Sequence, residues 1–292
     1  MNNNGFAGFS CIAILLCALS LPAQVGAAAP DSTSAAAKAQ PALWAQAVKI
    51  FEANKDLVPG KLLQKIQELE DDGSVKSESD AEISLALDGA GKIKSDIVKA
   101  SKDGKDVTAA ERKKAEERSK KEAAKEQKKK KDAEKNTKKD SKGDSDKDSK
   151  ENSHSISSGD SPFDPEIQNN VRITEANARE TIGSRSCARF GYTYPVPAEK
   201  PSKGKPTMVK GTAWIEESTG NPVKVEFTND PLPKGAKSML TTLHYGSGAN
   251  GSWIVGRMEF AASGSFLFLK KRIRGDIALS DYWKYIEPSP QK

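Results

Sequence analysis

The residue types from which catalytic and metal sites are most often built are scarce in this chain. It has two histidines and three cysteines among 292 residues. His154 lies in a charged, serine-rich stretch, and His244 follows Leu243 in a strand-like segment, where it is expected to point outward. A nucleophilic triad needs a positioned base, a zinc site needs clustered Cys, His or Asp ligands, and the sequence offers neither. It therefore predicts that the protein is not an enzyme and carries no metal or other cofactor.

Two further motifs lack the residues that their chemistry requires. Asp144, Asp146 and Asp148 have the spacing of a calcium-binding loop, but Ser149 stands where that loop needs glycine. The glycine-rich segment 246–251 is not followed by the Lys-Ser/Thr pair and the helix of a phosphate-binding loop. Both segments are interpreted as ordinary polar loops.

The cysteines point to export rather than to chemistry. Cys11 and Cys17 lie in an apolar run from Phe6 to Leu21, which is followed by small residues. This run is short for crossing a bilayer, which takes roughly 20 residues. The pattern predicts a secretory signal peptide over residues 1–27, cleaved near Ala27 and Ala28, and hence a periplasmic protein. The alternative is an uncleaved signal segment that anchors the chain.

The third cysteine stands apart from this segment. Without the signal peptide, Cys187 has no partner for a disulfide within the chain. Its surroundings, CARFGYTY, favour a small apolar residue on a strand over a reactive thiol. The residues before Cys11 and Cys17 do not fit a lipoprotein signal, so no lipid anchor is expected.

The net charge of +6 hides a strong division of the chain into segments. The segments expected are a signal peptide at 1–27, a flexible N-terminus at 28–40, an N-terminal helix and first strands at 41–107, a charged helix and disordered insert at 108–161, the remaining strands at 162–286, and a tail at 287–292.

The N-terminal segment predicts a helix followed by strands. Residues 41–56 carry an apolar stripe at helical spacing, which is expected to pack on a sheet; it consists of Leu43, Trp44, Ala47, Val48, Ile50 and Phe51. The stretch KLLQKIQELE at 61–70 is ambiguous, because its propensity favours a helix and its place before strands favours a strand. Alternating apolar residues at 81–87 and 93–97 predict two strands.

The charged insert predicts a helix without an apolar face. Thr108 and Glu111 have the spacing of a capping box, and Glu and Lys recur three and four residues apart after them. The following residues are too polar to form a core. Aromatic residues are missing, so a nucleic-acid interface is not expected. The insert is interpreted as a solvated spacer, whose run Lys128–Lys131 predicts at most weak contact with anionic surfaces.

The clearest strand signal is the hairpin MVKGTAWIEESTGNPVKVEF at 208–227. Apolar residues alternate with polar ones on both sides of a turn at 218–222. The face predicted to be apolar consists of Val209, Gly211, Ala213, Ile215, Val223, Val225 and Phe227. A hairpin alone is marginally stable, so this face must cover a core, a helix or a ligand.

Charged residues near the C-terminus have a plainer interpretation. Asp276 and Asp281 lie close in sequence to Arg272 and Arg274 and could form a charged pocket. Salt bridges along an edge strand are the preferred interpretation.

Several segments of the C-terminal half together resemble a known family. They are Gly211-TAWIEESTGNPVKVEF, Asp230-PLP, Thr241-Thr242, Trp253, Met258-Glu259-Phe260 and the closing Asp281-Tyr282-Trp283. The set resembles the C-terminal sheet of the periplasmic outer-membrane lipoprotein carrier (LolA-like) superfamily, and is most similar to its uncharacterised exported members. The resemblance spans about residues 162–285 and, more loosely, 41–107. The carrier proper uses a groove arginine in an N-terminal strand, whereas the first arginine here is Arg112.

The resemblance implies an α+β fold. Its core would be a strongly curved antiparallel sheet, an incomplete barrel, that covers helices and is interrupted by the long charged insert. Members shield acyl chains or act through protein partners. We therefore expect a non-catalytic binding protein that holds a lipid or a lipoprotein acyl chain in the concave face, with a possible envelope protein partner.

The expected lipid-binding residues are the large apolar ones on that face. They are Val209, Ile215, Val225, Phe227, Met239, Leu243, Met258, Phe260, Phe266 and Phe268. The alternative is a structural or regulatory envelope protein that acts through protein partners, with the charged insert as a tether. A helix at 43–51 that filled the whole concave face would leave no ligand site.

Overall fold

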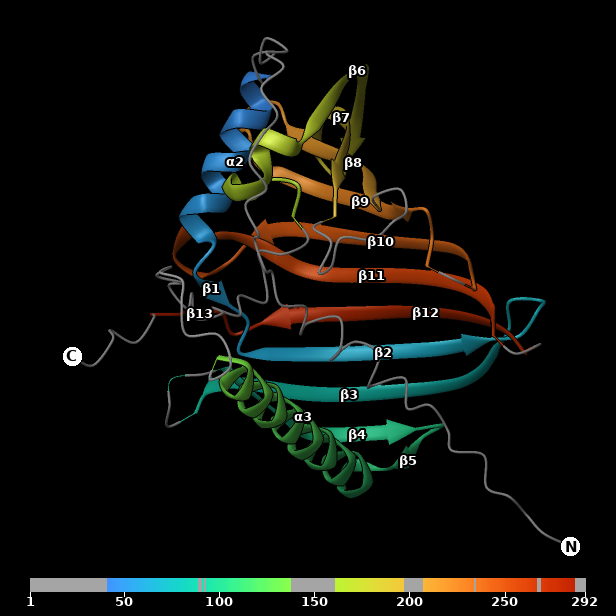
Figure 1. Ribbon diagram of the computed structural model, residues 1–292. Coiled ribbons are helices and arrows are strands. Elements are labelled where there is room, and N and C mark those ends of the chain that lie inside the picture. Colours follow the sequence, from blue (N-terminus) through green and yellow to red (C-terminus); the bar gives the residue numbers. More distant parts are fainter. Residues whose placement is uncertain are drawn as a thin grey trace, which may run out of the picture.

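The described residues build one open antiparallel sheet with two helices on one of its faces (Figure 1). The computed structural model describes residues 41–88, 91, 93–137, 161–196, 207–233, 235–266 and 269–286. The sheet has eleven strands in the order β5-β4-β3-β2-β12-β11-β10-β9-β8-β7-β6. Strand β12 of the C-terminal half pairs with β2 of the N-terminal half, so the segments on both sides of the charged insert share one sheet.

The elements follow the chain in a simple order. The helices are α2 (Ala42–Asn54) and α3 (Thr108–Thr137), with short 3-10 turns η1 (Pro165–Asn170) and η2 (Ala249–Gly251). The N-terminal strands are β1 (Leu57–Val58), β2 (Lys61–Leu69), β3 (Val75–Leu87), β4 (Ile93–Lys102) and β5 (Lys105–Asp106). The C-terminal strands are β6 (Arg172–Ile182), β7 (Arg185–Pro195), β8 (Met208–Glu216), β9 (Pro222–Asp230), β10 (Ala236–Ser247), β11 (Trp253–Phe266), β12 (Leu269–Ser280) and β13 (Trp283–Lys284).

The sheet is strongly twisted and unclosed. In Figure 1, β2, β3, β11 and β12 run from side to side, whereas β6, β7 and β8 run steeply from top to bottom. Such a rotation follows from the right-handed twist that accumulates from strand to strand. β5 and β6 are the two edges of the sheet, and β1 and β13 form a separate two-stranded sheet. An unclosed antiparallel sheet agrees with the expected incomplete barrel, although the helical content is small.

The ambiguous stretch at 61–70 is a strand. Leu62 and Ile66 are buried on one face of β2, while Leu63 and Lys65 are exposed on the other. β2 is paired on both sides, with β12 and with β3. These pairings override a helical propensity that amounts to only tenths of a kcal/mol per residue.

The predicted hairpin forms, with one error of face. β8 and β9 pair around a turn in which Gly220 has a φ of 73°. A bulge follows, because Trp214 lies opposite Lys224 while Ile215 lies opposite Pro222. It places the side chain of Val223 with Trp214 and Cys187 in a small separate cluster. The prediction that Val223 shares the face of Val225 is therefore wrong, since a bulge interrupts the alternation of faces.

Helix α2 is amphipathic, as its apolar stripe predicts. Trp44, Ala47 and Phe51 are buried, and Leu43 and Val48 pack against the same cluster. The helix begins after Pro41, whose carbonyl accepts a hydrogen bond from the N–H of Ala45 at 3.0 Å. Proline suits this position because it lacks a donor that the helix would leave unpaired.

Helix α3 corrects the expectation of a charged helix without a buried face. Its first turns pack on β4, where Glu111 is 8 % exposed and Ala115 lies against the core. The Thr108 hydroxyl does not bond the N–H of Glu111 as a capping box would; it bonds both backbone groups of Ala100 in β4. Arg112 donates to the backbone carbonyls of Ile97 and Val98. The start of α3 therefore covers the edge of β4.

The arginines near the C-terminus do not lie on an edge strand. β12 is paired on both sides, with β11 and with β2. Arg272 donates to the carbonyl of Asp71, and Arg274 donates to Gln67, so both contact the strand or turn of the N-terminal half. Asp276 pairs with Arg257 instead. The expected edge-strand salt bridges are thus contacts within the centre of the sheet.

Some expectations fall outside the described residues. They concern the signal peptide, the flexible N-terminus, the aspartates of the calcium-like spacing, His154 and the tail. No helix in the described ranges is both long and apolar enough to span a membrane.

Candidate functional site

A row of side chains crosses one face of the sheet at right angles to the strands. Each member lies directly opposite the next in the strand pairing, so all point to the same side. The row, here called the central row, consists of Phe190, Ala213, Val225, Leu243, Met258, Ile277, Gln64, Ala81 and Ala100. It runs from β7 to β4, and all of its members except Gln64 are apolar. We call this side the inner face.

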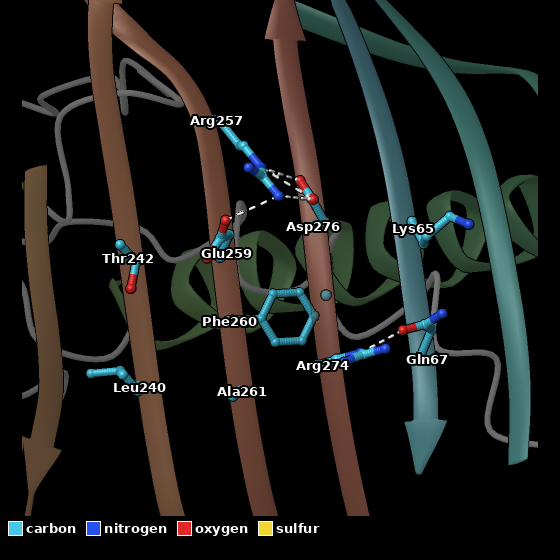
Figure 2. Close-up of a pocket in the computed structure, with 11 residues that line it drawn as sticks. Lys65, Gln67, Leu240, Thr242, Arg257, Glu259, Phe260, Ala261, Arg274 and Asp276 are labelled. Carbon is cyan, nitrogen blue, oxygen red and sulfur yellow. Dashed lines mark hydrogen bonds and ion pairs between the residues drawn. The ribbon is translucent and has the colours of Figure 1, made fainter. Parts of the chain in front are cut away.

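A second row lies two residues further along each strand, on the same face. It consists of Tyr192, Gly211, Phe227, Thr241, Phe260, Gly275, Ile66 and Ser79. Gly275 makes room for its neighbour, because a Cβ at that position would lie 2.1 Å from the ring of Phe260. Figure 2 shows this ring over β12. In this row, large side chains therefore alternate with small ones from each strand to the next.

The inner face is filled at the end that carries β7 to β10. There α2 and the residues before η1 pack on the sheet in an aromatic cluster. The indole of Trp44 lies 4.9 Å from the ring of Phe163 and 5.8 Å from that of Tyr192, and its Nε1 donates to Oε1 of Gln168 at 3.0 Å. Four expected lipid-binding residues belong to this solid core: Val209, Ile215, Val225 and Leu243.

The other end of the inner face carries a second core. Leu62, Ile83 and Ile97 are buried there, together with Val58 of the small β1–β13 sheet. Ala115 of α3 and Trp283 of β13 pack against this cluster. Helices α2 and α3 therefore lie over opposite ends of the same face.

Between the two cores the large side chains are only half-buried. Met258 packs against both clusters, Phe227 against the first and Phe260 against the second. Met239 is also half-buried on the inner face. These four expected site residues, Met258, Phe227, Phe260 and Met239, are here called the apolar bridge; the first three pack against the cores on either side. The backbone of Phe266 lies in β11 opposite Leu269, but its side chain and the whole of Phe268 lie outside the described part.

Gln64 is the exception in the central row. Its side chain is 4 % exposed, and neither its amide nitrogen nor its amide oxygen has a hydrogen-bond partner. Ile277 and Ala81 lie directly opposite it on the two neighbouring strands. A buried amide in such a setting is unusual, because buried polar side chains are hydrogen-bonded in the large majority of cases.

The outer face carries a polar hollow of about 540 Å³ (Figure 2). Arg257 spans two carboxylates there: its Nε lies 2.9 Å from Oδ1 of Asp276, and its Nη2 lies 3.0 Å from Oε1 of Glu259. Glu259 and Asp276 lie directly opposite each other on β11 and β12. Arg257 thus offsets the repulsion of two like charges on adjacent strands.

A second hollow of about 500 Å³ adjoins the first and shares Lys65 and Asp276 with it. Hydrogen bonds from Lys65 and from Gln67 lower the pKa of the nearby Glu78. Arg257 and Asp276 of this face are paired and about half exposed, at 52 % and 40 %. Such pairs are typical of a solvated sheet surface, so we favour the inner face as the binding site.

Three chemically reactive side chains of the described part, those of Cys187, His244 and Tyr245, lie in different surroundings. Cys187 is fully buried, as expected for a small apolar residue, and burial raises the pKa of its thiol. His244 lies 3.5 Å from Glu259 on the outer face. Burial raises the pKa of Tyr245 to about 12 against the opposing hydrogen bond from Ser161. Within the described ranges no group of three or more His, Cys, Asp or Glu residues is placed to hold a metal ion.

No protein-family model matches the chain, and no curated protein matches its sequence. Among solved structures, a DUF1329 family protein from Desulfovibrio piger is 9% identical, with 85% of this chain and 94% of that one covered and a TM-score of 0.33.

Two solved complexes give weaker matches. MucB in complex with MucA(peri) is 8% identical, with 82% of this chain and 99% of that one covered and a TM-score of 0.20. The MucA/MucB complex of Pseudomonas aeruginosa is 10% identical, with 81% and 94% covered and a TM-score of 0.19. Similarities at these TM-scores do not define the family or the function of this chain.

Proposed function

We propose that the protein is an exported, non-catalytic binding protein that holds the acyl chain of a lipid or a lipoprotein against the inner face of its sheet. The observation that carries this proposal is the apolar bridge. Met258 packs against both cores, and Met258, Phe260, Phe227 and Met239 are all large apolar side chains that are only half-buried. Apolar side chains at such a position gain free energy when a further apolar group covers them.

The position of the helices supports a chain-like ligand. α2 packs at one end of the inner face and α3 at the other. The central row between Leu243 and Gln64 spans three strand spacings, or about 14 Å. Each methylene group of the ligand that is buried there would contribute about 0.8 kcal/mol to the free energy of binding, before the cost of ordering the ligand is subtracted.

The proposal includes no chemical step. Cys187 is buried with a raised pKa, and His244 lies 3.5 Å from Glu259 on the opposite side of the sheet from the apolar bridge. A nucleophile and its base would have to lie within hydrogen-bond reach of each other. Most of the affinity would come from the apolar area that the acyl chain buries.

Native mass spectrometry tests the proposal. Residues 28–292 would be purified from cell envelopes without detergent, alongside Met258→Ser on the inner face and Leu240→Ser on the outer face. We expect the unsubstituted chain and Leu240→Ser to carry an added mass that organic solvent releases as lipid, and Met258→Ser to carry less of it.

Circular dichroism establishes that each variant is folded before its mass is compared. A chain that stays free of added mass, even after incubation with envelope lipids, would refute the proposal. That outcome would favour the alternative of a structural or regulatory protein that acts through protein partners.

A further inference from the structure

Gln64 lies where the proposed ligand would end. It occupies the central row on β2, two strands from Met258 on β11. At the usual strand spacing this distance is about 10 Å. Its neighbours on the row and along the strand are apolar and buried, namely Ile277, Ala81, Leu62 and Ile66. The amide therefore lies among buried apolar side chains, two strands from the apolar bridge.

An unpartnered amide in these apolar surroundings is destabilising. A buried donor or acceptor without a partner loses its hydrogen bonds to water and gains none in the fold. Leucine or methionine would fit the pattern of the central row, because all of its remaining members are apolar. The amide is therefore best explained by a polar group that binds to it.

The chemistry of the amide and its surroundings narrows the choice of that group. Nε2 donates hydrogen bonds and Oε1 accepts them, so a partner with a carbonyl oxygen and an N–H can satisfy both atoms. A carboxylate is disfavoured, because a charge needs a counter-charge when buried. Among the described residues the one buried charged side chain is Glu111, itself an anion.

We propose that Gln64 recognises the secondary amide through which an acyl chain is joined to its carrier group, and that it selects amide-linked chains over free fatty acids. This inference rests on the proposed function. Nε2 of Gln64 donates to the ligand carbonyl, and Oε1 accepts from the ligand N–H. The acyl chain then runs from β2 across β12 towards Met258 and Phe260.

Four ligands with matched chains test the proposal: N-methyldecanamide, methyl decanoate, undecane and decanoate. Binding to the folded chain, residues 28–292, would be measured by calorimetry for the unsubstituted protein, for Gln64→Met and for Gln67→Met. Gln67→Met is the matched control, because Gln67 lies on the same strand and bonds Glu78 and Arg274 on the outer face.

From tightest to weakest, we expect the order N-methyldecanamide, methyl decanoate, undecane and decanoate. The amide should bind about tenfold more tightly than undecane. Gln64→Met should lose this preference and bind undecane at least as well, whereas Gln67→Met should keep the preference. The melting temperature of unliganded Gln64→Met should equal or exceed that of the unsubstituted protein, because an unsatisfied amide has been removed.

The other outcomes separate the two proposals. If none of the ligands binds, the proposed function fails and this inference with it. If the amide and undecane bind equally and Gln64→Met changes nothing, the protein holds acyl chains but Gln64 does not recognise the amide; an internal water would then satisfy it. A melting temperature lowered by Gln64→Met, or affinity lost equally for every ligand, would assign Gln64 a structural role and overturn the inference.

Discussion

Truncation of Trp44 tests whether the α2 end of the inner face is a solid core. The indole is fully buried between Phe163, Phe190 and Tyr192, with ring centroids 4.9 Å, 6.0 Å and 5.8 Å away. Trp44→Ala should therefore reduce the free energy of unfolding by about 3–5 kcal/mol. Trp44→Phe keeps most of the ring volume but loses the hydrogen bond to Gln168, so a loss of about 1–2 kcal/mol is expected.

Urea and thermal unfolding followed by circular dichroism would measure these changes. For a domain of this size, the Trp44→Ala loss corresponds to a fall in Tm of roughly 6–20 °C. Glu52→Ala, at an exposed position of the same helix, is the control and should change stability by no more than about 0.5 kcal/mol. A loss below about 1 kcal/mol for Trp44→Ala would show that this end is loosely filled, and would refute the division of the inner face into a core and a binding region.

Three further changes have expected outcomes. Gly275→Ala should lower the free energy of unfolding in urea by about 1–3 kcal/mol, because the added Cβ would collide with the ring of Phe260. Gly256→Ala is the control and should be tolerated, because no atom lies within 4 Å of its added carbon. Equal effects of the two substitutions would contradict the packing of Phe260 on Gly275. Burial raises the pKa of Tyr245 from its ordinary value of 10.0 to about 12, so the native state holds this proton more tightly than the unfolded chain. The free energy of unfolding should then fall by up to roughly 2–3 kcal/mol as the pH rises from 10 to 12, and Tyr245→Phe should flatten this dependence; an unchanged slope would count against it. Cys187 should react with a thiol reagent far more slowly in the native protein than in urea, since it is fully buried, and equal rates would contradict its burial.

Local patterns in the sequence predicted much of the fold. The stripe from Leu43 to Phe51 and the alternation in 208–227 each depend on neighbours in sequence, and both elements form as expected. The bulge at Ile215 and Pro222 was not predictable, because inserting one residue leaves no mark in an alternating pattern. Val223 was assigned to the wrong face for that reason.

Long-range pairing was the main information missing from the sequence. Gln67 and Arg274 are 207 residues apart and hydrogen-bonded, and nothing in either segment specifies that β2 lies beside β12. The sequence of α3 shows no apolar stripe, so it did not indicate that the start of the helix packs on β4. There Ala115 lies against the second core.

The candidate site shows the same limitation. Period-two alternation predicted which side chains share a face, and eight of the ten expected residues have described positions there. It could not predict that α2 buries Val209, Ile215, Val225 and Leu243. Gln64 was missed because it lies in the stretch whose secondary structure was ambiguous, so its face and its apolar neighbours were unknown.

Photo-crosslinking tests the central claim most directly. An acyl amide with a diazirine in its chain would be bound to the folded protein, irradiated, and located by peptide mass spectrometry. We expect adducts on the apolar bridge at Met258 and Phe227, neither of which lines the outer hollow. Adducts on Leu240 or Ala261, which line the outer hollow, would contradict it by placing the ligand on the opposite face of the sheet.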